Sequence, residues 1–255
     1  MSEPVHIAAV DAGSNAVRLA VARAYSALDI EPLVSERYSL RLGEGVFLRH
    51  RFSEELLKKG VKAFRHFHAI MDEFGVTRYR AVATSASREA RNRHAFVRHI
   101  KEKTGISLEI INSSEESRLG RVAVLAALGP ESPPRCIADL GGGSLEISVL
   151  RDQSVEHSAQ LPVGAVRLMT TLKIPGVIRP VQAEQVRKYV RALLESRLPS
   201  RPNLGEQVAV ALGGNAGCSL RPDCPALHPR QGAEGLQSCF LAQLFRRSAS
   251  TAAFH

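Results

Sequence analysis

Short apolar runs alternate with polar, glycine-containing turns along most of this chain, and longer segments with helical spacing of their apolar residues lie between them. The short runs predict strands, and the longer segments predict helices. Strand-forming segments are expected at residues 6–10, 17–24, 30–42, 80–84, 108–111, 137–150, 153–162 and 208–212, and helices at 53–74, 95–104, 114–128 and 182–198. This mixture predicts an α/β protein.

The sequence Gly-Pro-Glu-Ser-Pro-Pro at residues 129–134 is the best candidate for a domain boundary. A chain of 255 residues, 44% of them hydrophobic, is long enough to form two lobes of ordinary domain size. We therefore expect a first lobe at residues 1–128 and a second, incomplete lobe at 129–216. Prolines, arginines and three cysteines interrupt the pattern at residues 217–255, which predicts a disordered, frameshifted or otherwise atypical tail.

Two glycine turns stand out, DAGSN at residues 11–15 and DLGGGS at residues 139–144. In each, an apolar strand ends in an aspartate, glycine follows, and a second apolar strand returns. Glycine gives backbone N–H groups room to approach phosphate oxygens and permits positive φ angles. The two segments therefore predict a pair of phosphate-binding hairpins around one site. An ordinary glycine hairpin is the alternative for either turn alone.

An aspartate that faces phosphate oxygens is repelled by them unless a cation or a water molecule lies between. Asp11 and Asp139 are therefore predicted ligands of Mg²⁺ or Mn²⁺. Glu146 is predicted to lie near the same ion, because it follows Asp139 on the returning strand of the hairpin.

The sequence segments around these turns resemble those of the Ppx/GppA family of exopolyphosphatases and guanosine pentaphosphate phosphohydrolases. This family has the actin, Hsp70 and sugar-kinase superfold. The resemblance rests on five segments in family order: DAGSN at 11–15 followed by Arg18, VATSASREARN at 82–92, IINSSEESR at 110–118, DLGGGSLE at 139–146 and LPVGAVR at 161–167. It implies two actin-like (ribonuclease H-like) lobes with a cleft between them, and release of orthophosphate from a terminal phosphoanhydride.

The resemblance also implies roles for individual residues. Glu116 matches the glutamate that activates water, with Asp139 and Glu146 as further catalytic acids. On sequence alone, the pair Glu115 and Glu116 is more typical of acids that stabilise a helix N-terminus. Glu115 is then expected to cap the helix or to support its neighbour. The predicted phosphate-binding residues are Gly13, Ser14, Asn15, Arg18, Arg88, Gly141, Gly142, Gly143 and Ser144, with Arg167 as a further arginine for charge neutralisation. For each of the three arginines, a surface position or pairing with Glu89 is an equal alternative.

Three functions are compatible with these residues. The first is a hydrolase acting on inorganic polyphosphate or guanosine pentaphosphate, and the sequence does not separate these substrates. The second is a non-catalytic sensor that binds polyphosphate or an alarmone. The third is an ATP-dependent kinase of the same superfold, which needs an acceptor. Relatives of this kind commonly form homodimers, so a homodimer is one candidate state, and the sequence leaves the oligomeric state open.

The amino-acid composition limits the classes of molecule that this chain is expected to bind. The 34 Lys and Arg residues exceed the 25 Asp and Glu residues, and the resulting net charge of +9 suits a polyanionic partner. The alternative is that a GC-rich coding sequence raises the arginine content without a functional cause. An aromatic content of 5%, the absence of Trp and the lack of a nucleic-acid-binding motif argue against nucleic acid. With no membrane-length apolar run and no signal-like N-terminus, the expected location is the cytoplasm. The four cysteines lack the spacing of a zinc site or a disulfide framework.

Overall fold

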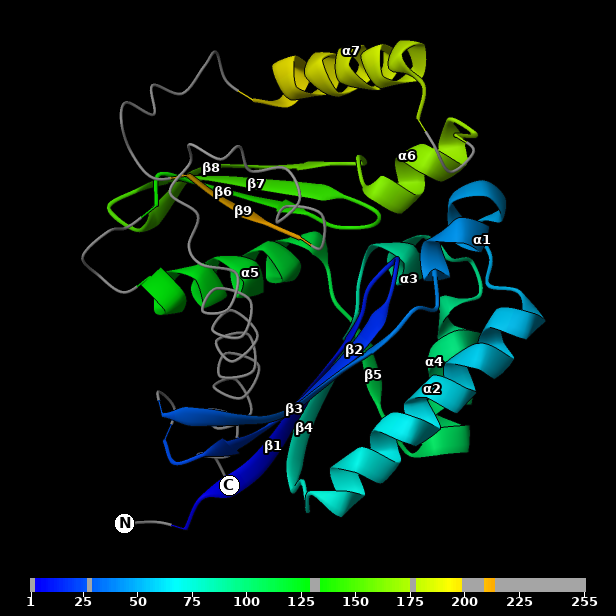
Figure 1. The fold of residues 1–255 in the computed structure, drawn as a ribbon, viewed down its shortest axis with the longest axis vertical. Helices are drawn as coiled ribbons and strands as arrows, with labels where there is room; N and C mark the ends of the chain where they lie inside the picture. Colours follow the sequence, from blue (N-terminus) through cyan, green and yellow to red (C-terminus); the bar gives the residue numbers. More distant parts are fainter. Residues whose placement is uncertain (1–2, 27–28, 129–133, 175–177, 199–208, 214–255) are drawn as a thin grey trace.

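The computed structural model describes residues 3–26, 29–128, 134–174, 178–198 and 209–213, which form a lower and an upper lobe in Figure 1. The prediction for the tail at residues 217–255 concerns residues outside this described part. Within the described part, every helix is too short or too polar to cross a lipid bilayer.

The first lobe is built on a five-stranded sheet with the order β3-β2-β1-β4-β5. Its strands are β1 (Val5–Ala12), β2 (Val17–Ala24), β3 (Ile30–Tyr38), β4 (Arg78–Ala83) and β5 (Leu108–Ile110). β1, β2 and β3 form an antiparallel meander, β4 runs parallel to β1, and β5 runs parallel to β4. Ala8 and Val10 of β1 belong to one buried cluster, and Ile7 and Ala9 belong to another. This central strand is apolar from Ile7 to Val10 because both faces of the sheet are covered there.

The second lobe repeats the first four strands of this topology. Its strands are β6 (Cys136–Leu140), β7 (Leu145–Arg151), β8 (Ser154–Leu161) and β9 (Ala209–Leu212), in the order β8-β7-β6-β9. β6 pairs antiparallel with β7 and parallel with β9, as β1 pairs with β2 and β4. Register shifts after Val21 and Val149 fall at the same distance from the aspartate of each turn. The duplicated turns of the sequence therefore belong to duplicated sheets.

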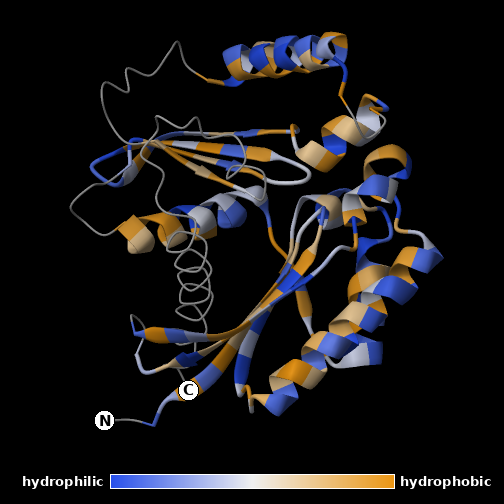
Figure 2. Ribbon diagram, viewed as in Figure 1, coloured by the Kyte–Doolittle hydropathy of each residue, from blue (hydrophilic) through white to orange (hydrophobic). Residues whose placement is uncertain are grey.

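Helices cover the outside of the sheets. They are α1 (Leu42–Arg49), α2 (Glu54–Glu73), α3 (Ser85–Glu89), α4 (Arg93–Thr104), α5 (Ser113–Leu128), α6 (Ala165–Thr171) and α7 (Pro180–Arg197). The Ser53 hydroxyl accepts a hydrogen bond from the Leu56 amide, which caps α2 as expected. α2 and α7 alternate between hydrophilic and hydrophobic segments in Figure 2, as helices with one buried side do.

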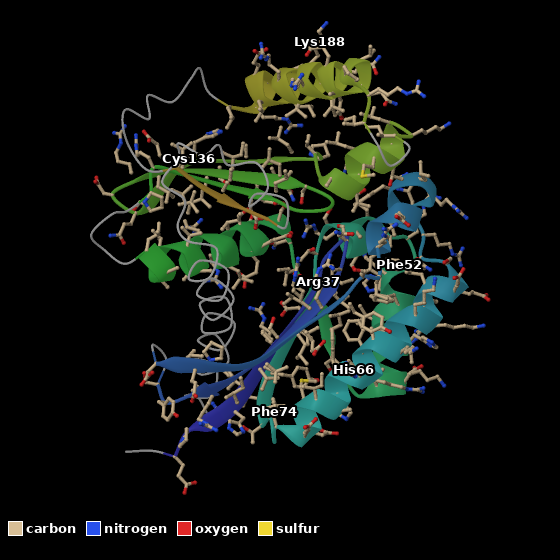
Figure 3. The ribbon with its side chains drawn as sticks, viewed as in Figure 1. Arg37, Phe52, His66, Phe74, Cys136 and Lys188 are labelled. Atoms are coloured by element: carbon tan, nitrogen blue, oxygen red, sulfur yellow. The ribbon has the colours of Figure 1, made fainter. Side chains whose placement is uncertain are left out.

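The first lobe has the larger core. Phe52, labelled in Figure 3, packs on Phe96 of α4 with ring centroids 4.6 Å apart. Phe64 and Phe67 of α2 are fully buried in the same cluster. His66, also labelled in Figure 3, lies on the exposed side of α2.

Helix α5 packs against the sheets of both lobes. Near its beginning, Leu119 is buried in a cluster with Ile7 and Val82 of the first sheet. Further along, Val124 is buried in a cluster with Ile137 and Leu150 of the second sheet. The N-terminal part of α5 therefore lies between the two sheets, close to both glycine turns.

The prediction of a strand at residues 30–42 was wrong at its end. β3 stops at Tyr38, and Leu42 begins the unpredicted helix α1, in which Leu42 and Val46 are buried. The sequence around residues 161–167 likewise contains the unpredicted helix α6. α1 and α6 contact one another across the two lobes. Leu40 and Leu42, which alternate with Ser39 and Arg41 as in a strand, are both buried in the core of the first lobe.

Candidate active site

The two glycine turns have matching geometry. The Gly13 amide donates to the Ala16 carbonyl over 3.1 Å, and the Gly141 amide donates to the Ser144 carbonyl over 3.0 Å. In the cross-strand register, Asp11 lies opposite Arg18, whereas Asp139 lies opposite Glu146. The same hairpin thus carries an acid–base pair in the first lobe and two acids in the second.

The glycine turns meet at the boundary between the lobes. A Cβ atom added to Gly143 would lie 2.6 Å from the Ser14 hydroxyl oxygen, and one added to Gly142 would lie 3.1 Å from the Asn15 nitrogen. The Ser14 hydroxyl in turn accepts a hydrogen bond from the Ala86 amide at 3.2 Å. The structure therefore brings together the predicted phosphate-binding residues of both turns and the segment that follows β4.

The predicted reason for glycine in these turns was half wrong. Among the described glycines, positive φ angles occur at Gly75, Gly105 and Gly213, and none of the turn glycines has one. What Gly142 and Gly143 supply is close approach, since a side chain at either position would meet the opposite turn. Tertiary contact, rather than backbone strain, requires these glycines.

Four carboxylates, Asp11, Glu116, Asp139 and Glu146, form an acid cluster beside the turns. Burial, followed by the charge of Glu146, raises the pKa of Glu116 to about 7 despite the opposing effect of Arg88. Burial and the charges of Glu146 and Asp11 raise the pKa of Asp139 to about 7 as well. Burial also raises the pKa of Asp11. Desolvation and like charge act in the same direction, so the cluster disfavours full ionisation.

Glu116 is placed by the beginning of α5. The Asn112 side-chain oxygen accepts a hydrogen bond from the Glu115 amide at 2.8 Å and so caps this helix. The Arg88 guanidinium donates to the Glu116 carboxylate at 2.7 Å and to the Ile111 carbonyl at 3.1 Å. Glu116 is therefore held by a guanidinium that is itself fixed to the backbone.

Glu115 supports this arrangement by ion pairs. Its carboxylate accepts hydrogen bonds from Arg80 at 3.2 Å and from Arg118 at 2.7 Å, and its side chain is only 11% exposed. Of the two roles expected for Glu115, capping thus belongs to Asn112. The buried pair fixes the first turn of α5 to β4.

The three arginines proposed for charge neutralisation all have acidic partners in the structure. Arg18 lies 3.5 Å from Asp11, and Arg88 pairs with Glu116. Arg167 of α6 pairs with Glu89 of the opposite lobe and donates to the Gly143 carbonyl at 2.6 Å. The Arg167 guanidinium also lies 4.0 Å from the centre of the Phe47 ring, a cation–π distance. Of the roles expected for Arg167, the structure shows the pairing with Glu89.

Sequence reasoning missed a small, open hollow between α5 and the face of the second sheet. It is lined by Ser117, Gly120, Arg121, Ile137, Asp139, Glu146, Ser148 and Leu212. A Cβ atom on Gly120 would lie 3.6 Å from the Asp139 carboxylate, so this glycine keeps the space beside the aspartate open. Arg121 gave no signal in the sequence because it lies outside the recognised segments, and it lines this hollow only because α5 packs against the second sheet.

The acid cluster limits the number of side chains that would bind a metal ion directly. Within the described residues, no group of three or more acidic, histidine or cysteine side chains is close enough together to hold a metal ion. Partly desolvated carboxylates with raised pKa values nevertheless suit a hard divalent cation, which is held by oxygen ligands and often retains water. Asp11, Asp139 and Glu146 therefore fit an ion bound by few direct ligands.

Comparison with known proteins agrees with this geometry. Residues 20–232 match the model of the Ppx/GppA phosphatase family. Exopolyphosphatase 2 of Mycobacterium tuberculosis is 31% identical over 216 residues, covering 82% of this chain and 67% of that protein. Exopolyphosphatase 1 of Mycobacterium leprae is 33% identical over 164 residues, covering 64% of this chain and 48% of that protein. The chain thus spans about half to two thirds of the length of these relatives.

Solved structures show the same fold. An exopolyphosphatase-like protein superposes with a TM-score of 0.73 at 26% identity, over 82% of this chain and 66% of that one. The Aquifex aeolicus PPX-GPPA enzyme superposes with a TM-score of 0.65 at 27% identity, over 83% and 69% of the two chains. The predicted α/β class with two actin-like lobes is confirmed. By its sequence match, its duplicated sheets and its paired glycine turns, this chain belongs to the Ppx/GppA phosphatase family.

Proposed function

We propose that this chain hydrolyses a terminal phosphoanhydride and releases orthophosphate from inorganic polyphosphate or guanosine pentaphosphate. The observation that carries the proposal is the position of Glu116, a partly desolvated carboxylate held by Arg88 beside both glycine turns. Family membership supports the same reaction, because the named relatives are exopolyphosphatases.

In the proposed reaction, backbone amides of the two turns bind oxygens of the terminal phosphates. Glu116 accepts a proton from a water molecule while the oxygen of that water attacks the terminal phosphorus. The bond to the bridging oxygen breaks, and the shortened chain leaves with this oxygen. A divalent cation bound by Asp11, Asp139 and Glu146 would offset negative charge on the phosphates. The chain itself orients Glu116 through Arg88 and the cap of α5.

The first test is orthophosphate release from polyphosphate and, separately, from guanosine pentaphosphate, with Mg²⁺ and with EDTA. We expect release that requires the cation and no acceptor. Release only in the presence of an acceptor would indicate the kinase instead. Binding of both polyanions without release, under every cation tested, would overturn hydrolysis in favour of the sensor. The candidate homodimer is a separate prediction, which light scattering tests.

Mg²⁺ is expected to stabilise the protein more at high pH than at low pH. The pKa values of Glu116 and Asp139 are raised from 4.5 and 3.8 to about 7, so the folded state binds more protons than the unfolded state between these limits. The free energy of unfolding contributed by these groups therefore falls as pH rises from about 4 to about 7. A bound cation relieves the same repulsion.

The measurement is the thermal midpoint with and without saturating Mg²⁺ at about pH 5 and about pH 8. The shift at the higher pH should be the larger one, and Asp139→Asn should reduce it. An equal shift at both pH values, unchanged in the variant, would place the cation away from the acid cluster.

A further inference from the structure

Helix α6 holds the second glycine turn by its carbonyl groups. The Ala165 amide donates to the Gly141 carbonyl at 3.2 Å, and the Arg167 amide donates to the Gly142 carbonyl at 3.0 Å. The Arg167 side chain completes the set, since its Nε donates to the Gly143 carbonyl at 2.6 Å. Three consecutive carbonyls of the turn are therefore bound by the beginning of α6.

These bonds also set the direction of the amides in the turn. In a planar trans peptide the N–H points opposite to the C=O, so the amides of Gly142, Gly143 and Ser144 face away from α6. Among the described residues, none of these three amides donates a hydrogen bond to another. They are available to an added acceptor such as a phosphate oxygen. The orientation of the Ser144 amide depends on the Arg167 side chain, which binds the carbonyl of the same peptide.

The same guanidinium reaches the first lobe. Its Nη atoms donate to both carboxylate oxygens of Glu89 in α3, one of them at 3.1 Å. Its central carbon lies 4.0 Å from the centre of the Phe47 ring in α1, and α1 and α6 are in contact (Figure 1). The side chain is only 16% exposed. One rigid, planar group thus joins the second glycine turn to the first lobe.

The partners of Arg167 favour a positioning role over direct contact with a phosphate. Each of its three side-chain nitrogens already donates to the chain, Nε to Gly143 and both Nη atoms to Glu89. Binding a phosphate in their place would leave the Glu89 carboxylate without this partner, at the cost of charge-assisted hydrogen bonds.

We propose that Arg167 is a positioning residue that couples the approach of the two lobes to the orientation of the Gly143–Ser144 peptide. This inference rests on the function proposed above. Glu89 and Phe47 of the first lobe hold the guanidinium. The guanidinium holds the Gly143 carbonyl, which directs the Ser144 amide toward the substrate phosphate. The second turn has its full set of oriented donors only when both lobes are in contact.

The test is the steady-state kinetics of orthophosphate release from tripolyphosphate by Glu89→Gln, Arg167→Gln and the double variant. Each single variant should lower kcat about 10- to 100-fold, the effect of a small misplacement at the site. KM should stay within about threefold, because the backbone of α6 still holds the other two carbonyls. The double variant should lose no more than either single one, because both changes remove the same link. Glu184→Gln, which breaks an exposed pair with Arg187 on α7, should leave both constants unchanged.

Arg167→Lys separates positioning from charge neutralisation. Lysine keeps the charge, but its ammonium does not reproduce the planar fork that serves Glu89 and Gly143 together, so kcat should stay close to that of Arg167→Gln. A direct role in neutralising phosphate charge predicts that Arg167→Lys retains most of the rate. It also predicts that Glu89→Gln lowers KM, because the arginine is freed. Either result in a variant shown by circular dichroism to be folded would overturn the proposal.

Small-angle X-ray scattering tests the joint between the lobes without any reaction. The radius of gyration should be larger for Glu89→Gln and Arg167→Gln than for the wild type and Glu184→Gln. If the wild type releases no orthophosphate yet the radius responds in this way, the reaction is wrong and the joint between the lobes stands. Equal radii in all four proteins would overturn the coupling, whatever their rates.

Discussion

Replacing Glu116 with glutamine is expected to lower kcat for orthophosphate release about 10²- to 10⁴-fold, the usual contribution of a general base. Glutamine has the shape of glutamate but does not accept the proton of the attacking water. It also keeps an oxygen within reach of the Arg88 guanidinium, which lies 2.7 Å from the carboxylate in the wild type. The loss should therefore fall on turnover, and KM should change little.

The matched control is Glu55→Gln on α2, where the carboxylate is exposed and pairs only with Lys59 in the same helix. Steady-state kinetics of both variants, with circular dichroism to verify folding, make the comparison. The wild-type rate should also rise with pH through the pKa of Glu116, about 7 before a cation binds. A folded Glu116→Gln enzyme with wild-type kcat would show that another group activates water.

The second large effect is expected at Gly164, which precedes α6. A Cβ atom at this position would lie 2.5 Å from the Gly142 carbonyl oxygen and still closer to the backbone joining Gly142 to Gly143. Backbone atoms do not rotate away as a side chain does, so Gly164→Ala should displace the second glycine turn. We expect a loss of about 1–3 kcal/mol in the free energy of unfolding, the range found for overpacking.

Phosphate release should fall with it, because the displaced turn carries the amides that we propose bind the substrate. Denaturant unfolding and orthophosphate release together test this expectation. Gly45→Ala is the control, since its Cβ would lie 3.4 Å from the Arg51 carbonyl oxygen and alanine favours the helix α1. Equal stability and activity in the two variants would show that the turn tolerates displacement.

The sequence by itself predicted the parts of the structure that depend on local chemistry. The helix expected at residues 53–74 is found at Glu54–Glu73 with its Ser53 cap, because capping and apolar spacing act within one segment. The two glycine turns and their aspartates were equally readable, since a hairpin is closed by neighbouring residues. The family-specific segments then indicated a catalytic role for Glu116. Composition and spacing alone favoured a role in stabilising the helix N-terminus.

Only the tertiary structure decided which charges meet. The pairing of Arg88 with Glu116 and of Arg167 with Glu89 joins segments far apart in sequence, so no local pattern shows it. The same holds for the start of α1, because Leu42 looked like the end of a strand and its burial in the core of the first lobe is set by tertiary packing. Arg121 belongs to no motif, and only the packing of α5 against the second sheet places it at the same hollow as Asp139. Electrostatic and steric interactions act through space, and the fold sets those distances.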